Sequence, residues 1–263
     1  MSKVSFVGAH AKIERAKEHI RDLDRETAAF LALNPYKVTP EFYVEHNATA
    51  YFLDEFQPIP VHIPLLAGDA AHNLRTALDY LAYSLIPKGA SSTPETHIYF
   101  PICKGLEEYR TESVRKTKGM PKEAKERIDA FKPYAGGDNR LWELHQLDII
   151  DKHRLLMTTA TIVTEMGFTI DTQYVEAAFK GLFKLPPDAI PKRTINFPAP
   201  KPLFSMEKGA LLCSVNGNFE TDQRVNLIFD VAFGESEVFS GKPILATLVE
   251  LTDLVESILL AFE

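Results

Sequence analysis

The chain has 263 residues, of which 45% are hydrophobic and 25% charged, and its formal net charge is −7 at pH 7. This composition is ordinary for a soluble globular protein, and the negative charge disfavours general attraction to nucleic acid. No apolar run is long enough to span a membrane and residues 1–5 lack the features of a secretion signal, so we expect a cytoplasmic location. The distant pair Cys103 and Cys213 argues against a disulfide scaffold or a zinc ribbon.

The first half of the chain reads mainly as helices. Helical periodicity of apolar residues and the placement of proline and glycine set the expected boundaries. The elements predicted in order are a helix over 9–33, a hairpin over 36–56 around His46-Asn47-Ala48, a central helix from Leu65 to Ile86, a loop over 88–96, a short strand over 97–102, a charged helix or mobile segment over 104–118, and a helix from Pro121 to about Phe131.

The second half begins with a helix and then becomes rich in β-branched residues. Asp138 or Asn139 suits the N-cap of a helix that runs to Arg154. The elements predicted after it are a strand over 156–164, a turn at Met166-Gly167, a strand over 168–174, a proline-rich connection over 185–202 with a strand over 194–197, a hairpin from 210–215 and 225–233 around Asn216-Gly217, and a last helix over 243–262.

These elements predict an α+β fold: a helical bundle, an antiparallel sheet from the second half of the chain, and a C-terminal helix that returns to the core. The hairpin over 36–56 either joins that sheet or stands apart. We expect one α+β domain over 1–263, with a helical part at about 1–154 plus 243–262 and a β part at about 155–240.

The central helix carries apolar and ionisable residues on different sides. At about 100° per residue, Leu74, Ala77, Leu78, Leu81 and Leu85 share one face. Another face holds His72, Arg75 and Asp79, at spacings that bring their side chains within reach of one another, with Asp69 and Asn73 beside them. Alanine and tyrosine residues between these charges indicate that a second element packs on the polar face, and buried charges need partners.

The helix after Asn139 is the expected partner. Its apolar residues point in nearly every direction, which is typical of a helix buried on most sides, yet it carries His145, Asp148, Asp151, Lys152 and His153. His145, Asp148 and Lys152 share a face by the same spacing rule. We therefore expect the two helices to lie side by side and to neutralise each other's charges.

Three motifs resemble a widespread bacterial family of uncharacterised proteins. The motifs are GDAAHNLRTALDYLAY in the central helix, FPI at 100–102, and LWELHQLDIIDKHRLL over 141–156, with a weaker likeness in VAFGE and the final helix. The likeness covers roughly 36–159. Tyr80 stands where this family commonly has His, and Ile149 where Asn is common. The resemblance implies no activity.

A fainter resemblance is to HEPN helical bundles, many of which cleave RNA without metal using an Arg and a His four to six residues apart. Arg140 and His145 have that separation. Leu141, however, stands where HEPN proteins often have a polar residue, and the β-rich second half is not needed by such a bundle. This analogy implies a metal-independent ribonuclease as one alternative function.

The candidate site is the set of polar side chains on the two helices. Proposed catalytic residues are His72, Asp79, His145 and His153, because a His oriented by an Asp serves as a general base near neutral pH. Proposed ligand-binding residues are Asp69, Asn73, Arg75, Asp148, Asp151, Lys152 and Arg154, with the cations holding a carboxylate or phosphate. The same groups can instead form a packing network with no ligand.

A metal site is a further reading. Asp69 with His72, and His145 with Asp148, have the spacing of paired ligands on a helix, but Arg75 and Lys152 lie close enough to compete with a metal ion. We therefore predict no metal and no cofactor. The function expected is binding or transforming a small anionic ligand. The alternatives are the HEPN-like ribonuclease, the only reading with a nucleic acid partner, and a structural or partner-binding protein. A homodimer is left open, and no membrane partner is expected.

Overall fold

The computed structural model describes residues 5–87, 97–156, 158–162, 166–168, 195–197, 208–216, 229–234 and 241–263. The chain divides into two compact units, which are described separately. The first comprises Met1–Ala28, Pro60–Thr158 and Phe233–Glu263, and the second Ala29–Ile59 and Thr159–Ala232. The expectation of a single domain stays a prediction.

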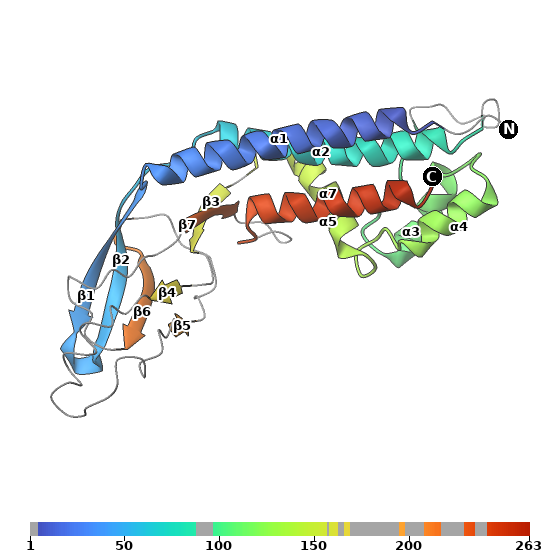
Figure 1. Ribbon diagram of the computed structural model, residues 1–263. Coiled ribbons are helices and arrows are strands. Elements are labelled where there is room, and N and C mark those ends of the chain that lie inside the picture. The colour runs from blue at the N-terminus through green and yellow to red at the C-terminus, as the bar shows by residue number, and fades with distance from the viewer. Residues whose placement is uncertain are drawn as a thin grey trace, which may run out of the picture. The chain divides into compact units, whose positions relative to one another are not determined.

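Six α-helices occur among the described residues (Figure 1). They are α1 (Val7–Ala32), α2 (His62–Ser84), α3 (Leu106–Lys116), α4 (Lys122–Ala130), α5 (Asn139–His153) and α7 (Ile244–Leu260). Each corresponds to a predicted helix, and the charged segment over 104–118 is the helix α3. The α+β class is confirmed, as is the return of the last helix, because α7 contacts α2 and α5.

The core of the first unit forms around α2. This helix contacts α5 and α7, and α1 runs alongside it (Figure 1). Leu74, Leu78 and Leu81 of α2 are at most 1% exposed, which confirms the predicted apolar face up to Leu81, whereas Leu85 after the end of α2 has intermediate exposure. Burial of each such side chain contributes about 1.5–3 kcal/mol. Two alanines between the polar residues, Ala70 and Ala71, are fully buried, so the small side chains do allow close helix packing.

The start of α2 differs from the prediction. Pro64 was expected to prevent helix before Leu65, but α2 begins at His62 and includes this proline. A proline in the first helical turn loses no hydrogen bond, because the first backbone N–H groups of a helix have no partner within it. The prediction placed the boundary about one turn too late because it treated Pro64 as a helix breaker.

The helix α5 is less buried than predicted. The Asp138 side chain caps it by accepting a hydrogen bond from the Arg140 N–H. Its fully buried residues are Leu141, Leu144, Leu147 and Asp148, which lie on one side, whereas Ile149 is 36% exposed. Apolar residues are distributed all around α5, but only those on one side of the helix are buried.

The strand predicted over 97–102 is wrong. Among the described residues, this segment pairs with no strand; the nearest bridge joins Cys103 to Tyr134. The Phe100 N–H donates to the Asp79 carboxylate at 2.9 Å, and the Phe100 carbonyl accepts from Arg75 at 3.0 Å. Side chains of α2 thus take the place of a neighbouring strand. Ile98, Phe100 and Ile102 are buried, with Phe100 fully enclosed, whereas Tyr99 is 43% exposed.

In the second unit, β1 (Tyr36–Tyr43) and β2 (Ala48–Phe56) form the predicted hairpin. The turn includes Asn47 in a left-handed conformation with φ of 42°. β2 also pairs antiparallel with β6 (Leu211–Asn216), giving the order β1-β2-β6 (Figure 1). The sheet was expected to consist mainly of strands from the second half of the chain, but the hairpin supplies two of its three strands. Of the two alternatives for the hairpin, joining a later strand is the one that the structure shows.

Two further strand predictions are wrong. β6 pairs with β2, and β7 (Phe229–Phe233) pairs with β3 (Thr158–Ile162), so the described parts of β6 and β7 do not form the expected hairpin. Met166-Gly167 was expected to turn, but lies in β4 (Met166–Phe168), whose partner is β5 (Ile195–Phe197). An alternating pattern identifies a strand but does not identify its partner. Pairing with a neighbouring strand can also keep a glycine such as Gly167 in an extended conformation.

The loop at 88–96, the strand beyond Phe168, most of the connection over 185–202, and the turn after Asn216 lie outside the described residues. Among the helices that are described, none combines the length and apolar character needed to cross a bilayer.

Candidate functional site

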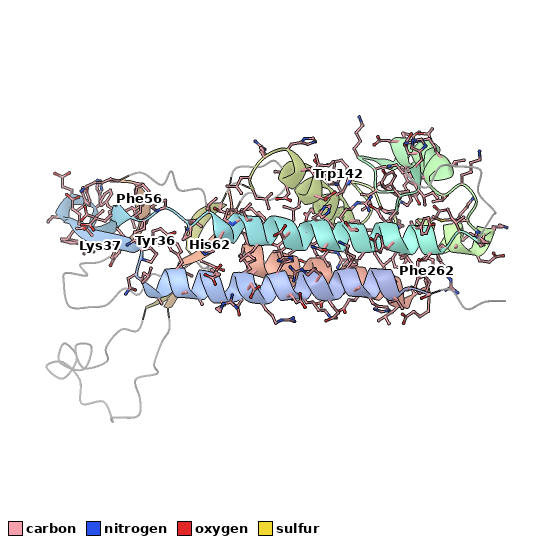
Figure 2. All side chains as sticks on the ribbon, turned by 90° about the horizontal axis from the view of Figure 1, so that it is seen from above. Tyr36, Lys37, Phe56, His62, Trp142 and Phe262 are labelled. Carbon is pink, nitrogen blue, oxygen red and sulfur yellow. The ribbon has the colours of Figure 1, made fainter. Side chains whose placement is uncertain are left out.

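The polar faces of α2 and α5 meet in a regular register. His145 contacts Arg75, Asp148 contacts His72, and the Asp151 carboxyl lies against Gly68. Residue numbers rise along α5 as they fall along α2, so the two helices are antiparallel, and one contact occurs at each turn. Figure 2 shows α2 between α1 and the helix α5 that carries Trp142. The predicted pairing of the two helices is confirmed.

The most accessible of these contacts joins a surface histidine to a buried carboxylate. His72 Nδ1 lies 2.7 Å from Asp148 Oδ1, and the Lys152 ammonium donates to Asp148 Oδ2 at 2.6 Å. The Asp148 side chain is 3% exposed, whereas those of His72 and Lys152 are 45% and 50% exposed. A carboxylate buried to this extent is stable only with partners, and here each oxygen has a donor.

The deeper contact is built around Arg75. Its Nη1 donates to Asp79 Oδ1 at 2.6 Å, its Nη2 to the Phe100 carbonyl at 3.0 Å, and its Nε to His145 at 3.5 Å. The Arg75 side chain is 6% exposed. Burial raises the pKa of Asp79, and the Arg75 guanidinium and the Phe100 N–H oppose that rise. The guanidinium therefore joins α2, α5 and the 97–103 segment within the protein.

His145 is held neutral by this environment. Burial, reinforced by the charge of Arg75, lowers its pKa to about 4. Lys116 and Lys152 act in the same direction, and Asp148 in the opposite one. Because Arg75 can only donate, the contact at 3.5 Å requires an unprotonated Nδ1 on the imidazole. The Trp142 ring lies beside it, with centroids 5.8 Å apart.

The third contact of the register depends on a glycine. A Cβ at Gly68 would overlap the Asp151 carboxyl group, so Asp151 occupies the space that this glycine leaves on α2. Burial raises the pKa of Asp151, and the carboxylates of Asp69 and Asp148 raise it further, whereas His72 and Lys152 lower it. Asp151 keeps intermediate exposure, unlike Asp148.

Two of the predicted site residues face α1. Asn73 donates to the Asp69 carbonyl at 2.8 Å and accepts from the Lys12 ammonium at 3.1 Å. The Asp69 carboxylate is 60% exposed and lies 4.0 Å from His19 Nδ1. Lys12 and His19 thus extend the polar surface from α5 across α2 to α1.

The remaining predicted residues lie apart from these contacts. His153 and Arg154 are exposed, and among the described residues neither side chain makes a hydrogen bond or ion pair. Tyr80 is 45% exposed and lies against Gly8, and Ile149 lies on the outer side of α5. The structure therefore brings together nine of the predicted residues in or beside the register: Asp69, His72, Asn73, Arg75, Asp79, His145, Asp148, Asp151 and Lys152.

Two other readings of the sequence find no support in this geometry. Among the described residues, no group of three or more His, Cys, Asp or Glu side chains is arranged to hold a metal ion. The two HEPN-like residues have different partners: Arg140 pairs with Asp138 at 2.7 Å and lies 3.9 Å from Glu250, whereas His145 faces Arg75.

Sequence reasoning missed Gly68, Phe100, Lys12 and His19. Gly68 had a detectable signal, since a glycine inside a helix costs up to about 1 kcal/mol and marks close approach of another group. Phe100 had none, because it acts through its backbone. Lys12 and His19 lie on the same side of α1 as the buried Leu23 and Phe30, and this placement of polar residues on an apolar face was a signal that the sequence analysis did not use.

Comparison with known proteins adds no assignment: no protein family model, curated protein or solved structure matches this chain.

Proposed function

We propose that this protein binds a small polar molecule carrying an anionic group at the surface where α2 meets α5, and that His72 transfers a proton to or from it. The observation that carries the proposal is the contrast in burial across one hydrogen bond. The carboxylate of Asp148 is almost completely enclosed, and the imidazole it contacts is half exposed. A hydrogen bond to one ring nitrogen determines which of the two nitrogens carries the proton.

The contact determines which ring nitrogen reacts. With Nδ1 donating its proton to Asp148, Nε2 is left with a lone pair and can accept a proton from a bound molecule. The carboxylate then stabilises the imidazolium that forms and keeps the ring oriented. Positioned general bases of this kind contribute roughly 10²–10⁴-fold to a reaction rate.

Lys152 supports the choice of an anionic ligand. Its ammonium is half exposed and lies on the other oxygen of Asp148, beside the imidazole. A carboxylate or phosphate contacting Lys152 would place the rest of the molecule near His72. Arg75 is not suited to that role, since its donors already bind Asp79, the Phe100 carbonyl and His145. We assign Arg75 and Asp79 to the framework that holds the helices in register.

Reactivity of His72 toward diethyl pyrocarbonate, which modifies neutral imidazole, tests the proposal. At about pH 8, where free imidazole is neutral, we expect His72 to react several-fold faster than the exposed His153, which serves as the internal reference. In Asp148→Asn the rate at His72 should fall to that of His153. Inorganic phosphate should protect His72 in the wild type and not in Lys152→Ala. Peptide mass spectrometry measures each site.

A second candidate is that the register is only a packing network, and the burial of Arg75 favours it. In that case His72 and His153 react alike, phosphate protects neither, and Asp148→Asn changes stability alone. Equal reactivity of the two histidines in the wild type would therefore contradict the proton-transfer proposal and leave the packing network as the better account.

A further inference from the structure

We propose that Asp151 is a second proton-transferring side chain of the same site, held in the space left by Gly68 one helical turn from His72. This inference rests on the function proposed for His72 and adds a carboxyl group that acts with it. The site would then contain two groups that exchange protons with the ligand, one imidazole and one carboxyl.

The position of Asp151 is set by both helices. Gly68 precedes His72 by four residues on α2, and Asp151 follows Asp148 by three residues on α5, so both pairs share a helix face. The Asp151 carboxyl packs on the bare Cα of Gly68, while Asp148 contacts His72. Any other residue at position 68 would displace the carboxyl. A glycine within a helix is unfavourable by about 0.5–1 kcal/mol relative to alanine. The space that Gly68 leaves for the Asp151 carboxyl can explain why a glycine stands at this position.

The surroundings of Asp151 suit a proton carrier. Asp148 is enclosed and bonded through both oxygens, so it is committed to orienting His72 and Lys152. Asp151 is more accessible, and burial together with the negative charges of Asp69 and Asp148 makes its carboxylate a stronger proton acceptor than an ordinary aspartate. The groups facing it are Asp69 and His72 from α2, and Asp148 and Lys152 from α5.

The chemistry balances without another reactant. The ionised Asp151 takes a proton from one atom of the bound molecule, and the protonated His72 returns one to another atom; the reverse reaction exchanges their roles. No electron is gained or lost, and exchange with water restores the two groups. This arrangement suits a reaction that shifts a proton within a molecule, in which an acid and a base act on the same substrate.

A pH titration of the aspartate carboxyl carbons by ¹³C NMR tests the geometric part. In the wild type Asp151 should titrate above the ordinary value of about 3.9. Gly68→Ala should move its midpoint down, because the displaced carboxyl becomes hydrated, and Asp69→Asn should also lower it. Gly105→Ala is the matched control, since a Cβ there meets no atom within 4 Å. An ordinary midpoint in the wild type would overturn the inference.

Hydrolysis of p-nitrophenyl acetate tests the chemical part, because accessible unprotonated imidazole and carboxylate groups accelerate cleavage of this activated ester. The rate in the wild type should include a component that appears as Asp151 loses its proton with rising pH. Asp151→Asn, which preserves shape, should remove that component only, and His72→Ala should lower the rate that remains. A component with the same pH dependence that survives in Asp151→Asn overturns this inference alone. Wild-type hydrolysis that equals that of His72→Ala at every pH overturns the proposed function as well.

Discussion

Replacing Arg75 with alanine is expected to lower the free energy of unfolding by about 3–5 kcal/mol. The guanidinium is 6% exposed and is the cationic partner of the Asp79 carboxylate. Removing it would leave that carboxylate partly buried, with the Phe100 N–H as its one remaining hydrogen-bond donor among the described residues, and would also free the Phe100 carbonyl. Urea denaturation of the purified variant measures the change.

Two other variants serve as controls for Arg75→Ala. Arg110→Ala removes a cation from an exposed helical pair with Glu107, whose side chains are 63% and 85% exposed, and should change stability by less than about 1 kcal/mol. Arg75→Lys should be intermediate, because one ammonium cannot reproduce the planar set of donors to Asp79, Phe100 and His145. An Arg75→Ala protein as stable as Arg110→Ala would show that the buried guanidinium does not hold the register together.

Acidification is expected to destabilise the protein through His145. Its folded-state pKa of about 4 lies below the unfolded value of about 6.5, so the unfolded chain binds the proton more readily. Neutral His145 makes its full contribution to the free energy of unfolding above pH 6.5, and this contribution declines as the pH falls toward 4. Below pH 4 the free energy of unfolding is lower by on the order of 3 kcal/mol. Denaturant unfolding at a series of pH values measures this slope.

The comparison with His145→Gln isolates the effect. Glutamine can still accept a hydrogen bond from Arg75 but does not titrate. The stability of the His145→Gln variant should therefore decline less between pH 6.5 and 4 than that of the wild type. Asp79 works in the opposite direction, since a carboxyl with a raised pKa takes up its proton more readily when folded. The difference between wild type and variant is therefore the informative quantity. Parallel stability curves for the two proteins would contradict a neutral, buried His145.

The sequence was sufficient to predict the helices and the partnership of α2 with α5. Periodicity located the buried Leu74, Leu78 and Leu81, and two helices with too many charges for an ordinary interior had to pair with one another. Strand partners were not predictable in the same way. Nothing local in Leu211–Asn216 specifies pairing with β2 rather than with β7, because strand pairing depends on distant residues.

The details of the site were harder to predict for a related reason. Helical spacing did not distinguish Arg75 from His72 as a residue that could contact a ligand. Only the fold shows that the Arg75 side chain is enclosed while that of His72 is half exposed. His153 was also proposed as a catalytic residue, but it is exposed at the end of α5. Phe100 contacts Arg75 and Asp79 through its backbone carbonyl and N–H groups. The type of residue at position 100 therefore gives no sequence signal for this contact.

The tautomer of His72 tests most directly whether a buried carboxylate prepares this imidazole to accept a proton. A long-range ¹H–¹⁵N correlation spectrum at mildly alkaline pH distinguishes the two ring nitrogens. We predict a protonated Nδ1 and an unprotonated Nε2 in the wild type, with that preference lost in Asp148→Asn. A wild-type spectrum showing the proton on Nε2, or one unchanged by Asp148→Asn, would contradict the proposed role of His72.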